Sequence, residues 1–159
     1  MLIATRSGKI NISKEKDTKL VAERLCKFIN LGDFILLTGN LGVGKTTFIK
    51  YIINSLQRIN RQKLSEVPSP TFNITNEYQI KKILIKHFDL YRIKNEKELN
   101  NLGIQENLKK QITLIEWPEI AKKLKIKNNI SLIFKYNKRY TERYLTIISK
   151  NKKIINEFK

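Results

Sequence analysis

A glycine-rich segment in the first third of the chain has the residue types and spacing of a phosphate-binding loop. It runs from Gly39 to Thr46, with the sequence Gly-Asn-Leu-Gly-Val-Gly-Lys-Thr, and fits the pattern G-x-x-x-x-G-K-S/T at every fixed position. Glycines permit backbone conformations that other residues avoid, so successive N–H groups can converge on one phosphate. A helix that starts directly after the loop adds the partial positive charge of its N-terminus.

The end of this segment suits a nucleoside triphosphate with magnesium, and we expect ATP and Mg²⁺ as the ligands. Lys45 offers a full positive charge to the β- and γ-phosphates. The Thr46 hydroxyl can ligate Mg²⁺, which binds few protein groups and keeps water and phosphate oxygens as its other ligands. The residues expected to bind the nucleotide are Asn40, Leu41, Gly42, Val43, Gly44, Lys45, Thr46 and Thr47.

The segments on both sides of the loop favour this interpretation over an incidental glycine turn. Phe34 to Thr38 is a compact apolar run, as expected of a buried parallel strand that leads into the loop. After the loop, apolar residues recur at helical spacing, at Phe48, Ile49, Ile52, Ile53 and Leu56. A strand, a glycine loop and a helix in this order are the context that the motif requires.

Two acidic residues are candidates for the carboxylate that a P-loop enzyme needs near its magnesium. Glu116 follows the apolar run Ile112 to Ile115, so we expect it at the end of a strand, where ligands bind in open α/β sheets. Asp89 follows another predicted strand. Glu116 could instead be an ordinary loop residue, and Asp89 could cap the next turn. Chemistry favours Glu116 over Asp89 and leaves open which lies nearer the attacking water; with Lys45 they are the predicted catalytic residues.

Three further features have both a functional and an ordinary interpretation. Ser69-Pro70-Thr71 could be a switch-like loop in which a hydroxyl senses the γ-phosphate, although its prolines would suit a rigid surface turn as well. His87, the one histidine of the chain, lies on a predicted strand and is more typical of a packed residue than of a catalyst. Trp117 is more typical of a core residue than of a platform for a nucleotide, although its neighbour Glu116 keeps it among the candidate site residues.

Elements of other nucleotide enzymes are missing from the sequence. No Asn-Lys-x-Asp occurs, so the usual guanine-reading element of GTPases is absent; the segment from Tyr136 to Tyr140 comes nearest and lacks the aspartate. There is no arginine-rich lid like the one with which small kinases clamp two phosphoryl groups. Arg139 and Arg143 remain as basic candidates near the end of the chain.

The pattern along the chain predicts a single α/β domain of the P-loop NTPase type, a mixed sheet flanked by helices. We expect the P-loop ATPase domain to span residues 1–149 and a solvated, basic tail to follow at 150–159. The other expected elements are an extended piece at Leu2–Ile12, a helix that Ser13 caps and that continues to about Ile29, strands at Thr71–Gln79 and Lys82–Phe88, short helical pieces within Asn95–Lys110, a short helix at Pro118–Lys123, and a hairpin of Ile130–Tyr136 and Tyr144–Ile148.

Length and composition limit the class of protein. The chain has 159 residues, the size of one ordinary domain, and 41% of them are hydrophobic. No apolar run approaches the roughly 20 residues of a membrane span, and Met1 to Ile10 lacks the apolar core of a signal peptide. We therefore expect a cytoplasmic protein without a membrane partner. The single cysteine, Cys26, predicts a buried, reduced thiol rather than a disulfide framework.

The net charge of +18 raises the question of nucleic-acid binding. Lysine supplies 25 of the 32 basic residues, and isoleucine and asparagine occur 25 and 16 times. These three residues share A/T-rich codons, and no nucleic-acid-binding module is recognisable, so we favour genomic base bias over nucleic-acid binding as the origin of this profile. A weak contact with tRNA or an acidic protein partner stays open.

Together and in their order, the motifs resemble the TsaE family, formerly called YjeE. The matching segments are Gly39 to Thr47, Ser69-Pro70-Thr71-Phe72, His87-Phe88-Asp89-Leu90-Tyr91-Arg92, Leu102-Gly103-Ile104 and Glu116-Trp117-Pro118. The resemblance extends from about Ser13 to about Leu145. It implies a bacterial ATPase that is needed for threonylcarbamoyladenosine synthesis on tRNA, with the compact P-loop fold described above.

The resemblance also implies partners: a TsaD–TsaB complex stimulates an ATPase that is slow alone, and this complex modifies adenosine 37 of tRNAs that read codons beginning with A. The chain would then meet tRNA indirectly. By the same resemblance Thr46 and Glu116 hold magnesium, Ser69-Pro70-Thr71 forms a switch-like loop, Asp89 serves hydrolysis or positions water, and Trp117 belongs to a Glu-Trp pair. Asn40 stands where the family often has aspartate, and the family pattern does not explain the tail.

Two other hypotheses remain. A small P-loop kinase acting on a metabolite or nucleotide would need an acceptor pocket, and its acceptor would raise nucleotide turnover by orders of magnitude. A nucleotide-dependent tRNA-binding module with little catalysis would bind tRNA tightly and with a steep salt dependence. The placement of the acids and the scarcity of arginine favour the hydrolase.

Overall fold

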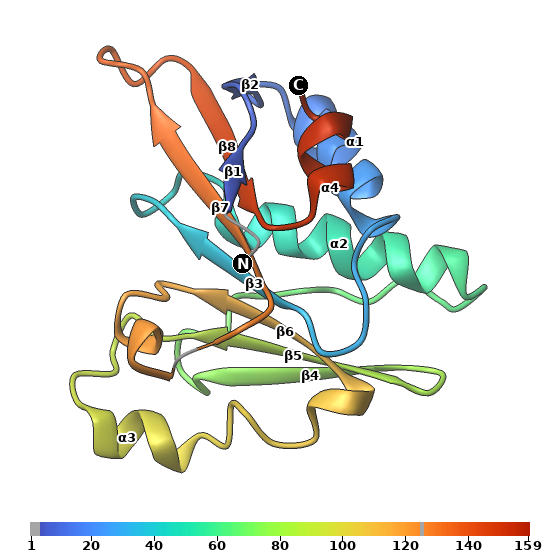
Figure 1. Ribbon diagram of the computed structural model, residues 1–159, viewed down its shortest axis with the longest axis vertical. Coiled ribbons are helices and arrows are strands. Elements are labelled where there is room, and N and C mark those ends of the chain that lie inside the picture. The colour runs from blue at the N-terminus through green and yellow to red at the C-terminus, as the bar shows by residue number, and fades with distance from the viewer. Residues whose placement is uncertain (1–3, 125) are drawn as a thin grey trace.

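The computed structural model describes residues 4–124 and 126–159. Within this part of the chain, the strands form one mixed, 8-stranded sheet with the order β1-β8-β7-β3-β6-β5-β4, and β2 pairs with β8 beside this path (Figure 1). The strands are β1 Thr5–Arg6, β2 Ile10–Asn11, β3 Phe34–Thr38, β4 Thr75–Ile80, β5 Ile83–Asp89, β6 Gln111–Glu116, β7 Asn129–Tyr136 and β8 Arg143–Ser149. The helices are α1 Glu15–Cys26, α2 Lys45–Ile59, α3 Glu96–Asn101 and α4 Lys152–Glu157, with short 3₁₀ helices at Leu108–Lys110 and Ile120–Leu124.

The centre of the sheet is parallel and buried on both faces. Strand β3 pairs in parallel with β6 on one side and with β7 on the other, and β5 pairs in parallel with β6. All six residues of β6 are buried, as expected for a parallel strand between two layers of helices. The mixed sheet and its flanking helices confirm the predicted fold class.

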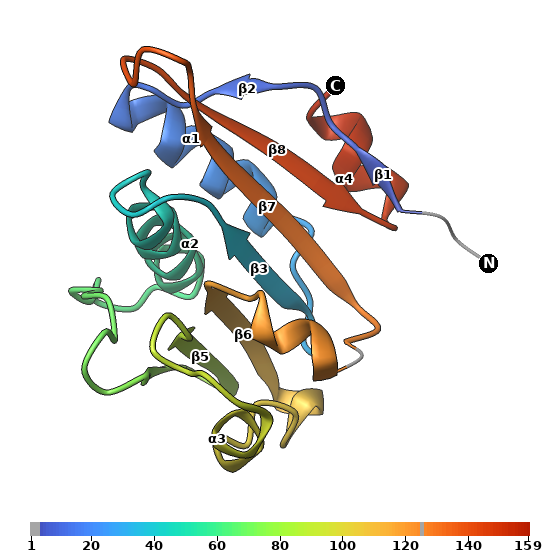
Figure 2. The ribbon, with the colours of Figure 1, turned by 90° about the vertical axis from the view of Figure 1, so that its left-hand side faces the viewer.

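Two apolar clusters fill the space on the two faces of the sheet. Ile35 and Leu37 of β3 join the larger cluster, which contains the buried sides of α1, α2 and α4. Phe34 of the same strand joins the smaller cluster with Leu99 of α3, as the alternation of side chains along a strand requires. Figure 2 shows α1 and α2 next to each other, with α3 at the far end of the sheet.

The segments next to the phosphate-binding loop have the expected structure. Strand β3 begins at Phe34 and ends at Thr38, as predicted. Helix α2 begins at Lys45, and its apolar stripe of Phe48, Ile49, Ile52 and Ile53 is completely buried. The strand and the helix therefore anchor both ends of the loop in the core.

The first helix differs from its prediction. Ser13 does not cap it, because α1 begins after Lys14, and the Ser13 hydroxyl instead accepts a hydrogen bond from the backbone N–H of Arg143 at 2.9 Å. Phe28 and Ile29 lie beyond the last helical residue, although both pack against the core. The tertiary contact with β8 thus replaces the local cap that the sequence suggested.

The last ten residues are not the solvated tail that we expected. Residues 152–157 form α4, in which Ile154 and Ile155 are buried, and Phe158 is only 5% exposed. Arg24 of α1 donates to the carboxylate of Glu157 at 2.8 Å and lies 5.1 Å from the Phe158 ring centroid. The expectation is wrong because it relied on the lysine-rich composition of this segment. The three apolar residues of the segment instead form one side of the helix end that is buried against the core.

The remaining elements differ from prediction mainly at their ends. The strand expected from Thr71 begins only at Thr75, because the chain first makes a turn in which Ile74 donates to the Pro70 carbonyl oxygen. The predicted extended piece at the start is present as β1 and β2, while Leu2 and Ile3 lie outside the described residues. The hairpin of β7 and β8 and the helical pieces on either side of Gly103 are confirmed.

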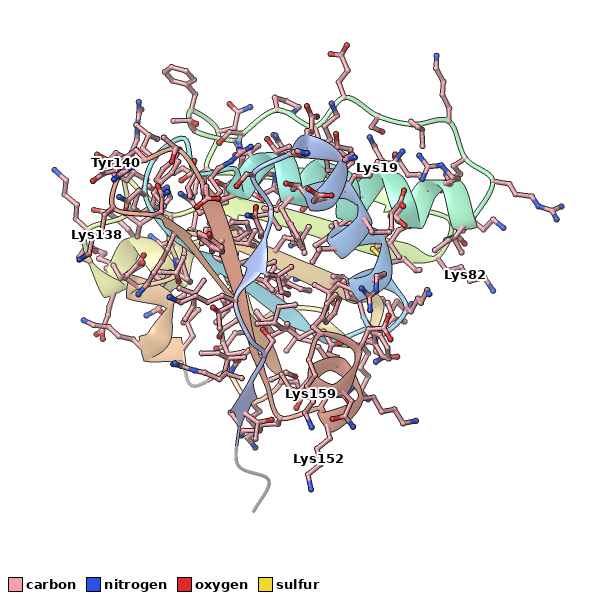
Figure 3. All side chains as sticks on the ribbon, turned by 90° about the horizontal axis from the view of Figure 1, so that it is seen from above. Lys19, Lys82, Lys138, Tyr140, Lys152 and Lys159 are labelled. Carbon is pink, nitrogen blue, oxygen red and sulfur yellow. The ribbon has the colours of Figure 1, made fainter. Side chains whose placement is uncertain are left out.

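Basic side chains surround the molecule instead of gathering in one place. In Figure 3, Lys82, Lys138 and Lys152 project from widely separated parts of the outline. Within the described residues, no helix is both long and apolar enough to cross a bilayer.

Candidate functional site

Three parallel strands end at the same edge of the sheet and bring the predicted site residues together. Glu116 of β6 is the register partner of Leu37 in β3 and of Asp89 in β5. The glycine-rich loop starts right after β3, so it lies beside both carboxylates. Ligands of open α/β sheets bind at this edge because the loops and helix N-termini converge there.

The loop depends on glycine at positions where its backbone is strained or crowded. A Cβ on Gly39 would lie 2.7 Å from the carbonyl oxygen of Phe134, so a side chain has no room there. Gly44 precedes α2 with a φ of 108°, a conformation that L side chains rarely adopt. Val43 anchors the loop with a fully buried side chain, and Leu41 extends into solvent with 83% of its surface exposed. Val43 can therefore meet a ligand only through its backbone.

Lys45 lies inside the site. Its ammonium group donates to the carbonyl oxygens of Gly39 at 2.7 Å and Asn40 at 2.9 Å, and it lies 4.0 Å from the centroid of the Trp117 ring. Burial lowers the pKa of Lys45, while the charges of nearby carboxylates, that of Glu116 foremost, oppose this shift. The lysine is therefore held against the loop and next to an aromatic face.

Thr46, Glu116 and His87 form a chain of hydrogen bonds. The Thr46 hydroxyl donates to Glu116, at 2.8 Å from Oε1 and 3.1 Å from Oε2. Nε2 of His87 lies 2.9 Å from Oε1 of the same carboxylate. Glu116 is 3% exposed and His87 is completely buried. The predicted pair of magnesium ligands, Thr46 and Glu116, is thus in direct contact.

Asp89 has a different set of partners. Its Oδ2 accepts a hydrogen bond from the Ser69 hydroxyl at 3.0 Å, and its Oδ1 accepts one from the backbone N–H of Tyr91. The Thr71 hydroxyl lies 3.0 Å from Ser69 Oγ and 3.4 Å from Asp89 Oδ2. Pro70, between the two hydroxyl residues, is buried. The predicted switch-like loop is therefore tied to Asp89.

An aromatic pair closes one side of the site. Trp117 is half-buried with a φ of 57°, and its ring lies 5.0 Å from that of Tyr91. The residue pattern favoured Trp117 as a core residue, but it lines the site. Tyr91 was missed; its position two residues after Asp89, within the segment His87 to Arg92, was the available signal.

These residues line a pocket of about 420 Å³, composed of Leu41, Gly42, Gly44, Lys45, Thr46, Thr47, Ser69, Thr71, Asp89, Tyr91, Glu116 and Trp117. Asn40 instead lines a neighbouring hollow with residues of the β7–β8 turn. A slightly larger hollow of about 480 Å³ lies where β3 and β7 begin, at the opposite edge of the sheet, and contains none of the loop.

The two arginine candidates lie outside the pocket. Arg139 is exposed in the turn between β7 and β8. Arg143 donates from Nη2 to the carbonyl oxygen of Ser13 at 2.7 Å, and its Nη1 lies 3.4 Å from where a Cβ on Gly44 would be. Arg143 therefore supports the outside of the loop, and Arg139 has no contact with it that the structure describes.

The fold and the loop together define a P-loop protein of the α/β class. A family model described as "Threonylcarbamoyl adenosine biosynthesis protein TsaE" matches residues 12–145. The chain belongs to the TsaE family.

Individual relatives agree with this assignment. A protein from Rickettsia felis, named tRNA threonylcarbamoyladenosine biosynthesis protein TsaE, is 39% identical over 113 residues, which are 71% of this chain and 64% of that protein. This chain thus spans less than two thirds of that relative. The protein of the same name from Bacillus subtilis is 34% identical over 76% of this chain and 72% of its own length. The crystal structure of Bacillus subtilis YdiB has the same fold, with a TM-score of 0.73 and 22% identity over 98% of this chain and 93% of that chain.

Proposed function

We propose that the chain is a cytoplasmic ATPase that hydrolyses ATP with Mg²⁺ during threonylcarbamoyladenosine synthesis on tRNA. Its partner is a TsaD–TsaB complex, which modifies adenosine 37 and through which the chain meets tRNA. The observation that carries the proposal is the direct contact of Thr46 with Glu116 beside the glycine loop. The names of the relatives, which are tRNA threonylcarbamoyladenosine biosynthesis proteins, supply the biological setting.

The donor atoms of the site fit magnesium. The Thr46 hydroxyl and the Glu116 carboxylate are oxygen donors, which Mg²⁺ prefers. Among the described residues, no three histidine, cysteine or acidic side chains converge to hold a metal ion. A metal held by two protein groups and completed by phosphate oxygens is typical of Mg²⁺ in nucleotide sites. When bound, the ion neutralises negative charge on the phosphates.

The remaining residues orient the nucleotide and the attacking water. Backbone N–H groups of the loop and the N-terminus of α2 hold the phosphates. Lys45, already buried beside the loop, contributes its charge to the β- and γ-phosphates. Asp89 positions the water, and the Ser69 hydroxyl, which donates to its carboxylate and contacts the Thr71 hydroxyl, couples this step to the switch-like loop.

The site lacks a group that would make hydrolysis fast. No arginine is among the residues that line the pocket, and an arginine supplied to a P-loop site raises turnover by about 10³–10⁵. Arg143, which lies against Gly44 of the loop, is held by the Ser13 carbonyl oxygen. We infer that the isolated chain is slow and that its partner supplies or orders the missing contact.

Steady-state ATP hydrolysis by the purified chain, with and without a purified TsaD–TsaB pair, tests the proposal. We expect strong stimulation by the pair that disappears in Lys45→Ala. Tight ATP binding without stimulation by competent partners would contradict it. Turnover that rises by orders of magnitude only with a small-molecule acceptor would identify a kinase instead.

A further inference from the structure

The chain's one histidine is buried directly behind the acidic end of the site. His87 lies on β5 with no exposed surface. Its Nε2 lies 2.9 Å from Oε1 of Glu116, and Nδ1 has no hydrogen-bond partner among the described residues. Within the described part of the chain the imidazole therefore has one polar contact, which is with the carboxylate that also meets Thr46.

The contact determines where the hydrogen of the ring lies. An ionised carboxylate only accepts hydrogen bonds, so the hydrogen between the two groups belongs to Nε2. A hydrogen on Nδ1 would be a buried donor without an acceptor, which is unfavourable. The arrangement thus favours the tautomer that donates from Nε2 to Glu116.

The hydrogen bond selects one orientation of the carboxylate. Rotation about the last bond of a glutamate side chain has broad, roughly two-fold minima, so packing alone fixes it weakly. The Thr46 hydroxyl contacts both oxygens of Glu116, Oε1 at 2.8 Å and Oε2 at 3.1 Å. His87 contacts Oε1 alone. Because the two oxygens are equivalent, this second contact fixes the plane of the carboxylate, with one oxygen held by His87 and the other left with Thr46 as its only partner among the described residues.

We propose that His87 is a positioning residue, which holds Glu116 in the orientation that ligates magnesium together with Thr46. This inference rests on the proposed function, because it takes Glu116 as a magnesium ligand. Groups that orient a metal ligand typically change metal affinity by about 10–100-fold when they are removed. A histidine that only packed in the core would affect stability and leave the coupling between magnesium and nucleotide unchanged.

The tautomer can be observed without any nucleotide. Because the chain has one histidine, ¹⁵N-labelled protein gives a single pair of imidazole nitrogen signals. We expect the Nε2–H tautomer, and we expect the signals to shift in Glu116→Gln. The Nδ1–H tautomer, or signals indifferent to Glu116→Gln, would overturn the inference, whether or not the chain hydrolyses ATP.

Calorimetry of ADP binding, with excess Mg²⁺ and with EDTA, measures the coupling. In the wild-type protein Mg²⁺ should raise the affinity for ADP, and in His87→Leu we expect this increase to be about 10–100-fold smaller. The ADP affinity of His87→Leu in EDTA should be close to that of the wild type. His87→Gln, whose amide nitrogen can donate to the same oxygen, should retain most of this tightening. The His87→Gln protein also controls for the loss of the ring, should His87→Leu fold poorly.

The outcomes separate this inference from the proposed function. If Mg²⁺ raised the ADP affinity of His87→Leu as much as that of the wild type, the role of His87 alone would be overturned. The same would follow if His87→Leu and His87→Gln lost this effect of Mg²⁺ equally. No magnesium tightening in the wild-type protein would overturn both the role of His87 and the proposed magnesium site.

Discussion

Asp89 and Glu116 occupy paired positions on the adjacent parallel strands β5 and β6, yet their carboxylates have entirely different partners. Glu116 is bound by Thr46 and His87. Asp89 is bound by Ser69, Thr71 and the backbone of Tyr91. The two acids therefore belong to two parts of the site, one beside the helix that follows the loop and one beside the switch-like segment.

Removal of the charge at Glu116 should impair the chemical step through the metal. We expect Glu116→Gln to lower partner-stimulated ATP turnover by about 10²–10³-fold, because charge stabilisation in the transition state is lost. ADP affinity in EDTA should stay near that of the wild type, since the loop itself is unchanged. Turnover at the wild-type rate would exclude Glu116 from the site's chemistry.

Substitution of Asp89 should act on hydrolysis more than on binding. Asp89→Asn retains hydrogen-bonding capacity but cannot orient or accept a proton from water as a carboxylate does. We expect turnover to fall by about 10²-fold or more, because the contribution of a positioned base is lost. The affinity for ADP–Mg should change by less than about threefold. A loss confined to nucleotide affinity would place Asp89 in binding. Ser69→Ala is the matched test of the loop, and its loss of turnover should be smaller.

The single tryptophan offers an optical signal for binding. The Lys45 ammonium lies 4.0 Å from the centre of the Trp117 ring, so movement of the lysine toward a phosphate changes the environment of the indole. We expect a saturable change in tryptophan emission on titration with ADP–Mg. Lys45→Ala should lack this change at the same concentrations. An unchanged emission, where calorimetry shows binding, would mean that the lysine does not leave the ring.

The C-terminal helix should contribute measurably to stability. Phe158→Ala removes a ring that is 5% exposed and packed beside Arg24, and should lower the free energy of unfolding by about 3 kcal/mol. Lys159→Ala, a change at an exposed neighbour, should alter it by less than about 0.5 kcal/mol. Urea denaturation measures both. Equal, negligible effects would show that residues 152–158 do not pack as described.

Cys26 should make stability depend on alkaline pH. Burial raises the pKa of this thiol from 9.0 to about 12, against a smaller lowering by its hydrogen bond with Ser55 and with a minor further rise from the charge of Glu23. Above pH 9 the unfolded chain loses the thiol proton while the folded chain keeps it, so stability falls as pH rises from about 9 toward 12. Between pH 8 and pH 10 the loss should be roughly 1–2 kcal/mol.

Comparison with Cys26→Ala isolates this contribution, because the tyrosines and lysines titrate alike in both proteins. Urea unfolding at the two pH values should show the wild-type protein losing more stability than the variant. An identical loss in both would mean that the thiol is accessible to water.

The sequence predicted the elements that local patterns determine. A continuous apolar run and an amphipathic stripe were enough to locate β3 and α2 around the loop, because both patterns depend on neighbours in the chain. Glu116 and Asp89 could be placed at strand ends for the same reason. The resemblance paired Thr46 with Glu116, but the contacts of His87 with Glu116 and of Ser69 with Asp89 could not be predicted, since they depend on the order of strands in the sheet.

The errors arose where distant contacts override local signals. Ser13 has the residue type of a helix cap, but its hydroxyl is taken by the backbone of Arg143. The lysine-rich end of the chain has the composition of a solvated tail, but Phe158 finds a place against α1. Trp117 resembles a core residue by type, and only the fold shows that its ring faces Lys45.

The most direct test is a crystal structure of the chain with ADP and Mg²⁺. We predict the phosphates on the N–H groups of residues 42–47, Lys45 on the β-phosphate, and the metal ion beside the Thr46 hydroxyl on the side of Glu116. A nucleotide bound elsewhere, such as in the hollow where β3 and β7 begin, or a metal ion remote from both side chains, would contradict the account.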